Sequence, residues 1–215
     1  GAPTLKASPY VGGVQVERSA GPTRVVVGFA GAKSERKGSA VASVLDSMIG
    51  TSGGAYKEPG MIGCKAVETV AKSGSITSLS SFSHSYAAEG LMGVSMTVDS
   101  GKNVPAAIKT ATDLVKSIAK GGVSARDLAR AKARAKMNYA SALETRDGRR
   151  DDIAHQVLDF GSAVKTEESL AAFDAVTAEQ VSDLARFMLS NDISYAVKGA
   201  VEHVPRYDHA NALRQ

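Results

Sequence analysis

The 215-residue chain has a single cysteine and no long apolar segment, so it lacks both the disulfides of small secreted proteins and the hydrophobic runs of membrane-spanning ones. Its single cysteine, Cys64, excludes an intrachain disulfide and favours a reducing compartment, where a lone thiol is typically buried and inert. No run approaches the roughly 18–20 consecutive apolar residues that a membrane-crossing helix needs. The longest candidate, residues 25–30, has only the length of a strand, and no signal-peptide pattern opens the chain.

Aromatic residues are scarce as well. They make up 5% of the chain and tryptophan is absent, so alanine and valine must fill much of the core. The net charge of +4 is modest, and no basic tract is interleaved with aromatic residues as single-strand binding would require. We therefore expect an ordinary globular protein without a nucleic-acid partner.

The sequence also lacks the spacings that mark common catalytic sites. Its four histidines include no pair four residues apart, so neither HExxH nor HxxEH occurs, and no GxSxG elbow is present. The glycine-rich segment 50–63 matches neither a P-loop nor a dinucleotide-binding fingerprint. We predict no catalytic, cofactor-binding or metal-ligating residues and no cofactor. Activation of Cys64 by a following helix and a base distant in sequence stays an open alternative.

Hydrophobic periodicity and capping signals divide the chain into strands and helices. Two strands at 14–18 and 24–30 flank a turn at 20–22 and are expected to pair as a hairpin. Asn103, Ser124, Thr166 and Thr177 are read as helix caps, and Thr177 with Gln180 forms a capping box. The other predicted elements are helices at 37–49, 61–72, 103–120 and 124–145, a helix from the Asp147-Gly148 break to 160, strands at 76–87, 91–98 and 194–199, and a loop at 50–63.

Strands that meet in hairpins and helices that follow in a run are typical of an α+β fold. We predict an antiparallel or mixed sheet with helices packed on one face. The domain organisation that follows is an extended arm at 1–9, a single α+β domain at 10–203 and an irregular tail at 204–215.

The stretch FSHSYAAEGLMGVSMT at 82–97 brings a histidine, a tyrosine and a glutamate close together. On a strand, His84 and Tyr86 lie on one face, and Glu89-Gly90 can make the turn. A hydrogen-bonded triad of His84, Tyr86 and Glu89 would lack a nucleophile or a metal. We therefore favour the corner of a hairpin over a catalytic constellation.

A basic segment, residues 124–150, carries eight Lys/Arg against three acidic residues. Arg126, Arg130 and Arg134 are spaced four apart and so lie on one helical face. The segment is either a solvated helix face or a docking surface for an acidic partner or lipid headgroups.

Five segments in order resemble motifs of the pitrilysin-type metallopeptidase superfamily, in its C-terminal homologous half. Ser85 to Gly93 resembles the "SYxDxGLFG" hairpin, and Tyr10 to Gln15 resembles the "YxGGExR" opening. The other three are 44–50, similar to a helix ending in "LLG"; 128–132 with 143–145, similar to a long helix with "AKxxLKxxYLxxLES"; and 196–201 with 204–207, similar to the closing "VAxGDVxxLPYxDEL".

The resemblance implies a metallopeptidase-like α+β domain without catalysis, because the zinc motif of the superfamily lies in its other half. The motifs are most similar to the branch of core subunits of mitochondrial respiratory complex III (ubiquinol–cytochrome c reductase). That branch implies a structural scaffold at the matrix side of the inner membrane. A sister branch, the mitochondrial processing peptidases, implies a non-catalytic substrate-binding half instead. Its glycine-rich loop corresponds to residues 50–63, which residues 56–59 interrupt here.

The resemblance also implies partners. They are a core protein 1-like subunit and the cytochrome b and cytochrome c₁ subunits of complex III. Because family members usually carry two homologous halves, we expect a separate N-terminal half that packs against this chain. The chain would then be a cleavage product or a separately encoded piece.

Overall fold

A computed structural model describes residues 10–52, 63–86 and 89–215. The strands are β1 (Gly13–Arg18), β2 (Thr23–Gly31), β3 (Thr51–Ser52), β4 (Ile76–Ser85), β5 (Gly90–Val98) and β6 (Ser194–Gly199). The helices are α1 (Arg36–Ile49), α2 (Lys65–Ser73), α3 (Val104–Ala119), α4 (Ala125–Ala142), α5 (Arg146–Phe160), α6 (Thr166–Asp174), α7 (Ala178–Ser190) and α8 (Tyr207–Ala212), with a 3₁₀ turn at Gly101–Asn103. The predicted α+β class is confirmed.

The strands form one mixed sheet in the order β1-β6-β2-β5-β4-β3. The hairpin of β4 and β5 is confirmed, because the two strands pair antiparallel from Ile76 to Ser85. The predicted hairpin of β1 and β2 is wrong. Strand β6 lies between them, parallel to β1 and antiparallel to β2. A short turn brings two strands near each other, but it does not exclude a third strand from the space between them.

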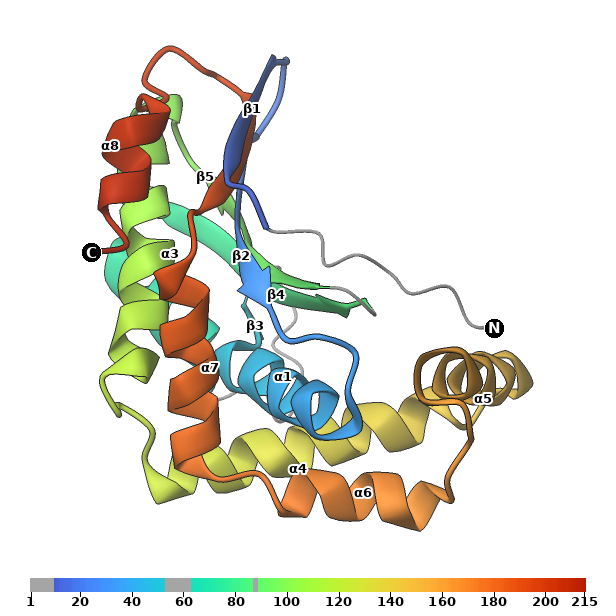
Figure 1. Ribbon diagram of the computed structural model, residues 1–215. Coiled ribbons are helices and arrows are strands. Elements are labelled where there is room, and N and C mark those ends of the chain that lie inside the picture. Colours follow the sequence, from blue (N-terminus) through green and yellow to red (C-terminus); the bar gives the residue numbers. More distant parts are fainter. Residues whose placement is uncertain (1–9, 53–62, 87–88) are drawn as a thin grey trace.

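Alternation along the strands decides which face of the sheet is buried. On β2, Val25, Val27 and Phe29 are fully buried and face the helices, with Val94 and Met96 of β5 beside them. Helices α1, α3 and α7 pack on this face, and alanines such as Ala111 and Ala185 let them approach closely. Figure 1 shows α3, α7 and α8 together on this side of the sheet.

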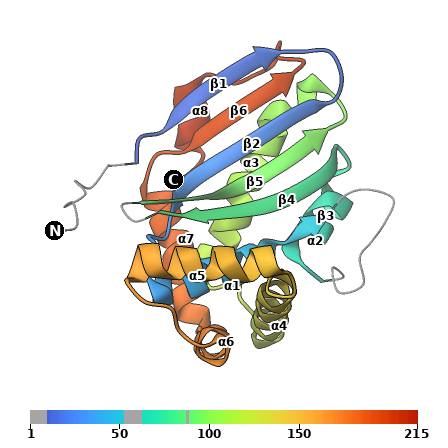
Figure 2. The same ribbon diagram turned by 90° about the vertical axis from the view of Figure 1, so that its right-hand side faces the viewer.

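The opposite face of the sheet is covered by none of the described helices, and Figure 2 shows it toward the viewer. We call it the bare sheet face and define it by Val26, Ser80, Ser95 and Ala196, which are neighbours in register and half-buried. Small side chains and the adjacent Gly28–Gly93 pair make this face shallow.

Several helix ends differ from expectation. Ser124 and Thr177 cap α4 and α7 as predicted, and the capping box of Thr177 with Gln180 is complete. Asn103 precedes α3, but its side chain donates to Asp99 instead of capping the helix. Thr166 is the first residue of α6 rather than its cap. Helix α5 begins at Arg146, and its cap Thr145 accepts from the Gly148 N–H. The predicted break at Asp147-Gly148 therefore lies inside the first turn of the helix.

Three element boundaries are corrected as well. Within the predicted loop at 50–63, Thr51–Ser52 pairs with Leu79–Ser80 as β3, while residues 53–62 lie outside the described residues. The helix expected at 61–72 begins at Lys65. The strand expected at 76–87 ends at Ser85, and the predicted extended arm at 1–9 lies outside the described residues.

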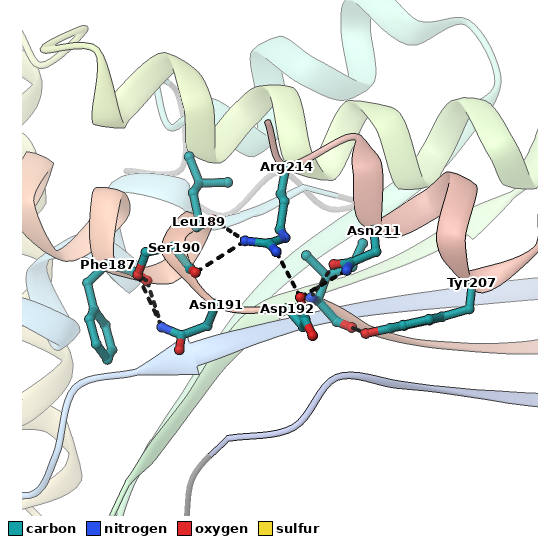
Figure 3. A network of polar contacts seen from close by, with 9 residues as sticks. Phe187, Leu189, Ser190, Asn191, Asp192, Tyr207, Asn211 and Arg214 are labelled. Carbon is teal, nitrogen blue, oxygen red and sulfur yellow. Dashed lines mark hydrogen bonds and ion pairs between the residues drawn. The ribbon is translucent and has the colours of Figure 1, made fainter.

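The tail at 204–215 is not irregular, because it contains helix α8. Its Ala210 is buried in the core, and its polar side chains hold the end of α7 (Figure 3). Tyr207 donates to the Ile193 carbonyl at 2.9 Å, and Asn211 accepts from the Ile193 N–H at 3.1 Å. Arg214 pairs with Asp192 at 2.9 Å and donates to the Ser190 carbonyl at 3.1 Å. We call this network the C-terminal clamp.

Candidate functional site: a groove between strand β4 and helix α5

A groove of about 800 Å³ runs between β4 and α5. Its floor comes from α1 and α4, and Figure 2 shows α5 lying below β4, in front of α1. The residues that line it are Ser34, Ser39, Ser43, Asp46, Ser47, Ser83, His84, Ser85, Tyr86, Ala135, Asn138, Tyr139, Asp152, His155, Gln156, Asp159, Phe160 and Phe173. The groove brings serine, aspartate, histidine and tyrosine side chains together in one concave region, so it is the candidate functional site.

Strand β4 forms one wall because its partner strand is short. Strand β3 pairs only with Leu79 and Ser80, and the C-terminal end of β4, from Ser83 to Ser85, borders the groove. The Ser81 N–H donates to the Gly50 carbonyl at 3.0 Å, and the Ser81 hydroxyl donates to the Asp46 carbonyl at 2.9 Å. These bonds fasten the C-terminal end of α1 to β4, beside the groove.

Asp46 is the most unusual group in the groove. Its side-chain oxygen Oδ1 is buried and has no hydrogen-bond partner among the described residues. Burial raises the pKa of the Asp46 carboxyl above its ordinary value of 3.8, while the neighbouring Ser81 hydroxyl and the charge of His84 act in the opposite direction. An acid in this setting keeps its proton to higher pH than an exposed aspartate does.

The candidate triad does not assemble. The rings of His84 and Tyr86 stack with centroids 6.5 Å apart, which confirms that they share one face. The Glu89 carboxylate instead lies 3.8 Å from the Lys33 ammonium. The Tyr86 N–H donates to the Glu89 carbonyl at 3.1 Å, as the corner of a hairpin requires, and residues 87–88 lie outside the described residues.

Other candidate ligands are dispersed. His155 lines the groove from α5. His203 precedes α8, and His209 lies within that helix. Within residues 10–52, 63–86 and 89–215, no group of three His, Cys, Asp or Glu side chains is placed to hold a metal ion. Cys64 is 2% exposed, and its Sγ lies 3.6 Å from the Thr51 carbonyl oxygen, as expected for a buried thiol.

The basic segment is partly used inside the molecule. Arg134 donates to the Ser47 carbonyl at 3.0 Å and so caps the C-terminal end of α1. On α6, Lys132 donates to the Asp174 main-chain carbonyl at 2.8 Å, and Lys136 donates to the Asp174 carboxylate at 2.8 Å. These three cations therefore join α4 to its neighbours. They are not a free surface for an acidic partner.

Sequence reasoning missed the groove as a unit. It singled out His84 and Tyr86 but not Asp46, which lies in α1 between the buried Leu45 and Met48. The available signal for Asp46 was its position as a polar residue at the edge of the apolar face of this helix. The contribution of α5 had no comparable signal, because it depends on where that helix lies in space.

Comparison with known proteins identifies the class of this domain. The family model described as the peptidase M16 inactive domain matches residues 2–135. The chain therefore belongs to this family, which confirms the resemblance read from the five motifs. The family's description agrees with the absence of a zinc-binding spacing in the sequence.

Individual relatives refine this assignment. The mitochondrial cytochrome b-c1 complex subunit 2 of Neurospora crassa is 31% identical over 201 residues, which cover 93% of this chain and 43% of that protein. Subunit 2 of Mus musculus is 31% identical over 60% of this chain and 28% of its own length. The mitochondrial-processing peptidase subunit alpha-2 of Dictyostelium discoideum is 28% identical over 93% of this chain and 44% of its own length.

A solved structure shares the fold. A chain of complex III₂ from Candida albicans superposes with a TM-score of 0.85 at 17% identity, covering 95% of this chain and 49% of that one. The chain thus spans less than half the length of these relatives. Among the described residues, none of the helices has the length and apolar composition that crossing a bilayer requires.

Proposed function

We propose that this chain is a non-catalytic structural core subunit, of the core protein 2 type, in mitochondrial respiratory complex III. The observation that carries the proposal is the 31% identity to a cytochrome b-c1 complex subunit 2 over 93% of this chain. Three further subunit 2 relatives match over shorter segments at 29–32% identity. The proposed location is the matrix side of the mitochondrial inner membrane, as a peripheral subunit.

In this role the chain acts through protein interfaces. The proposed partners are a core protein 1-like subunit, a separate polypeptide that supplies the N-terminal half of core protein 2, and the cytochrome b and cytochrome c₁ subunits. Obligate assemblies of this kind typically bury more than about 2,000 Å². We propose no proteolytic activity for the chain itself, because HxxEH is missing from its sequence and its family model is that of an inactive domain.

A second candidate function is the non-catalytic, substrate-binding half of a mitochondrial processing peptidase. The observation in its favour is the match to processing-peptidase alpha subunits over 93% of this chain. The groove beside β4 would then receive a peptide while another chain holds the zinc ion.

Purification in mild detergent from native membranes, followed by mass spectrometry, separates the two functions. We expect the chain to be recovered with cytochrome b and cytochrome c₁ in fixed stoichiometry. Recovery as a soluble pair with one HxxEH-bearing polypeptide, without cytochromes, would contradict the core-subunit proposal and support the second function.

A further inference from the structure

A second hollow extends from the groove toward α6. It has a volume of about 320 Å³ and is lined by residues of α1, α4, α5 and α6. Figure 2 shows α5 above α6, with α1 behind α5. The residues that line this hollow but not the groove are Ala40, Val164, Glu168, Ser169 and Ala172. We call the hollow the α6 pocket, and its volume falls within the roughly 300–1,000 Å³ of small-molecule sites.

Much of the wall of the α6 pocket is apolar. Ala40 and Phe173 are buried, and Phe160 and Ala172 line the pocket beside them. The rings of Phe173 and Tyr139 meet edge to face with their centroids 5.8 Å apart, which holds both rings in place. An apolar cavity of about 150 Å³ already accepts benzene. The α6 pocket therefore has room for an aromatic ring with a short side chain.

The polar end of the pocket is built around Asp152. Helix α5 carries Asp152, Gln156 and Phe160 four residues apart, so all three lie on the face that lines the pocket. The Asp152 Oδ2 atom accepts from the Tyr139 hydroxyl at 3.1 Å and from the Gln156 amide at 2.7 Å. Gln156 is 7% exposed, and its own oxygen accepts from the Val164 N–H at 2.9 Å. The Asp152 carboxylate is therefore held in one orientation.

One oxygen of this carboxylate is left for a ligand. Both hydrogen bonds go to Oδ2 of Asp152, and Oδ1 receives none from the residues that the structure describes. An ionised carboxylate offers about four acceptor positions. Burial raises the pKa of the Tyr139 hydroxyl, with Ser169 opposing that effect and Asp152 adding to it, so this donor keeps its proton and stays on Oδ2. A donor that enters the pocket would therefore meet Oδ1.

The charge of the pocket restricts the ligand. Its charged lining residues are Asp152 and Glu168, and no lysine, arginine or histidine lines it within the described part of the chain. A carboxylate beside an apolar wall attracts a cation more strongly than one surrounded by water does, and donors that carry a charge make the stronger hydrogen bonds. An anion would be repelled. A purely apolar guest would take water from Asp152 without replacing its hydrogen bonds.

We propose that the α6 pocket binds a small amine with an aromatic or branched aliphatic body. The ammonium group donates to Asp152 Oδ1, and the body packs against Phe160 and Phe173. The bound amine joins α5 to α6, because Asp152 and Phe160 belong to the first helix and Phe173 to the second. This binding goes beyond the proposed function and needs no partner subunit, so its failure leaves the core-subunit proposal untouched.

Titration of the full chain with phenethylamine, followed by ligand-observed NMR, tests the binding. Two probes of similar shape serve as comparisons: phenethyl alcohol, which is neutral, and hydrocinnamate, which is an anion. We expect saturable binding of the amine with a Kd of about 1 mM, about tenfold weaker binding of the alcohol and none of the anion. Absence of saturable amine binding, or an alcohol or anion that binds as well as the amine, overturns the proposal.

Two substitutions locate the binding. Asp152→Asn keeps the size of the side chain and removes its charge, so amine binding should weaken about tenfold or more while binding of phenethyl alcohol changes little. Ala172→Leu fills the pocket and should abolish binding of both probes. The matched control is Asp113→Asn on α3, an exposed carboxylate outside the pocket, which should leave both affinities unchanged. Unchanged amine binding in either pocket variant overturns the proposal.

Amide hydrogen exchange of the wild-type chain locates the site without any substitution. Saturating phenethylamine should slow exchange within 146–160 and 166–174, since the amine lies between α5 and α6, and should leave 207–212 unchanged. This measurement decides the matter even where a substitution disturbs folding. Slower exchange confined to other segments overturns the proposal.

Discussion

Helices α8 and α5 both lie at the surface, yet they are held in opposite ways. Helix α8 has only six residues, too few to be stable alone, and the C-terminal clamp and the buried Ala210 fix it to α7 and the core. Helix α5 has fifteen residues, one of them buried, and its apolar side chains Ile153, Val157 and Leu158 are exposed. The difference indicates that α8 completes the core of this domain, whereas α5 adds little to that core.

The largest expected effect comes from breaking the clamp. Tyr207→Ala removes a ring that stacks on Tyr195 at 6.3 Å and the hydrogen bond to Ile193. We expect the free energy of unfolding to fall by about 3 kcal/mol, as for other packed aromatic residues. Tyr207→Phe, which loses only the hydroxyl, should cost about 1 kcal/mol. Urea unfolding measures both, and equal losses in the two variants would contradict a role for ring packing.

A substitution near the N-terminus, at Gly12, should also disturb the C-terminal clamp. A Cβ at Gly12 would lie 1.9 Å from the Tyr207 hydroxyl and 2.5 Å from the Ile193 carbonyl oxygen. Gly12→Ala should therefore cost about 1–3 kcal/mol through overpacking. In a double-mutant cycle with Tyr207→Phe, the two losses should sum to more than the loss in the double variant. If the two losses of stability were strictly additive, the Tyr207 hydroxyl would not be the group that an added Cβ at position 12 meets.

Loosening α5 should have a smaller and more local effect. Gln156→Ala removes the side chain that links Asp152 to the Val164 N–H. We expect a loss of about 1 kcal/mol in global stability. Amide hydrogen exchange should rise mainly within 146–160. A loss as large as that of Tyr207→Ala would remove the contrast between the two helices.

The smallest effect concerns the groove beneath α5. Because the pKa of Asp46 is raised in the folded state, the native protein holds this proton to higher pH than the unfolded chain does. The free energy of unfolding should therefore fall as pH rises above 3.8 toward the folded-state pKa, and this contribution is constant at higher pH. Asp46→Asn should remove that fall, as urea unfolding across a pH series would show. The exposed Asp113→Asn is the control that leaves the carboxyl of Asp46 in place.

Local signals in the sequence predicted much of this molecule. The Thr177 capping box, the β4–β5 hairpin and the alternation through Val25 and Val27 each depend on neighbours a few residues apart. Those signals were sufficient for the α+β class and for most element positions. They also placed His84 and Tyr86 correctly on one face.

Long-range contacts determined what the sequence could not reveal. Helix α8 has few residues of its own to signal a helix, and its stability comes from partners such as Asp192 and Ile193. The burial of Asp46 depends on β4 and the groove, which are assembled from distant segments. The position of α5 depends on tethers to Ser34 and Tyr139.

The place of β6 has a consequence for how the domain acquires its structure. The last strand enters between the first two, and hydrogen bonds such as Tyr10 to Ser194 and the Ala200 N–H to Thr23 join residues 184 and 177 positions apart. Contacts of such separation are slow to form, because a long loop must close before any bond compensates. Until the C-terminal segment arrives, β1 has no neighbour and β2 exposes a hydrophobic edge. A newly made chain should therefore need protection from aggregation for longer than its size alone would require.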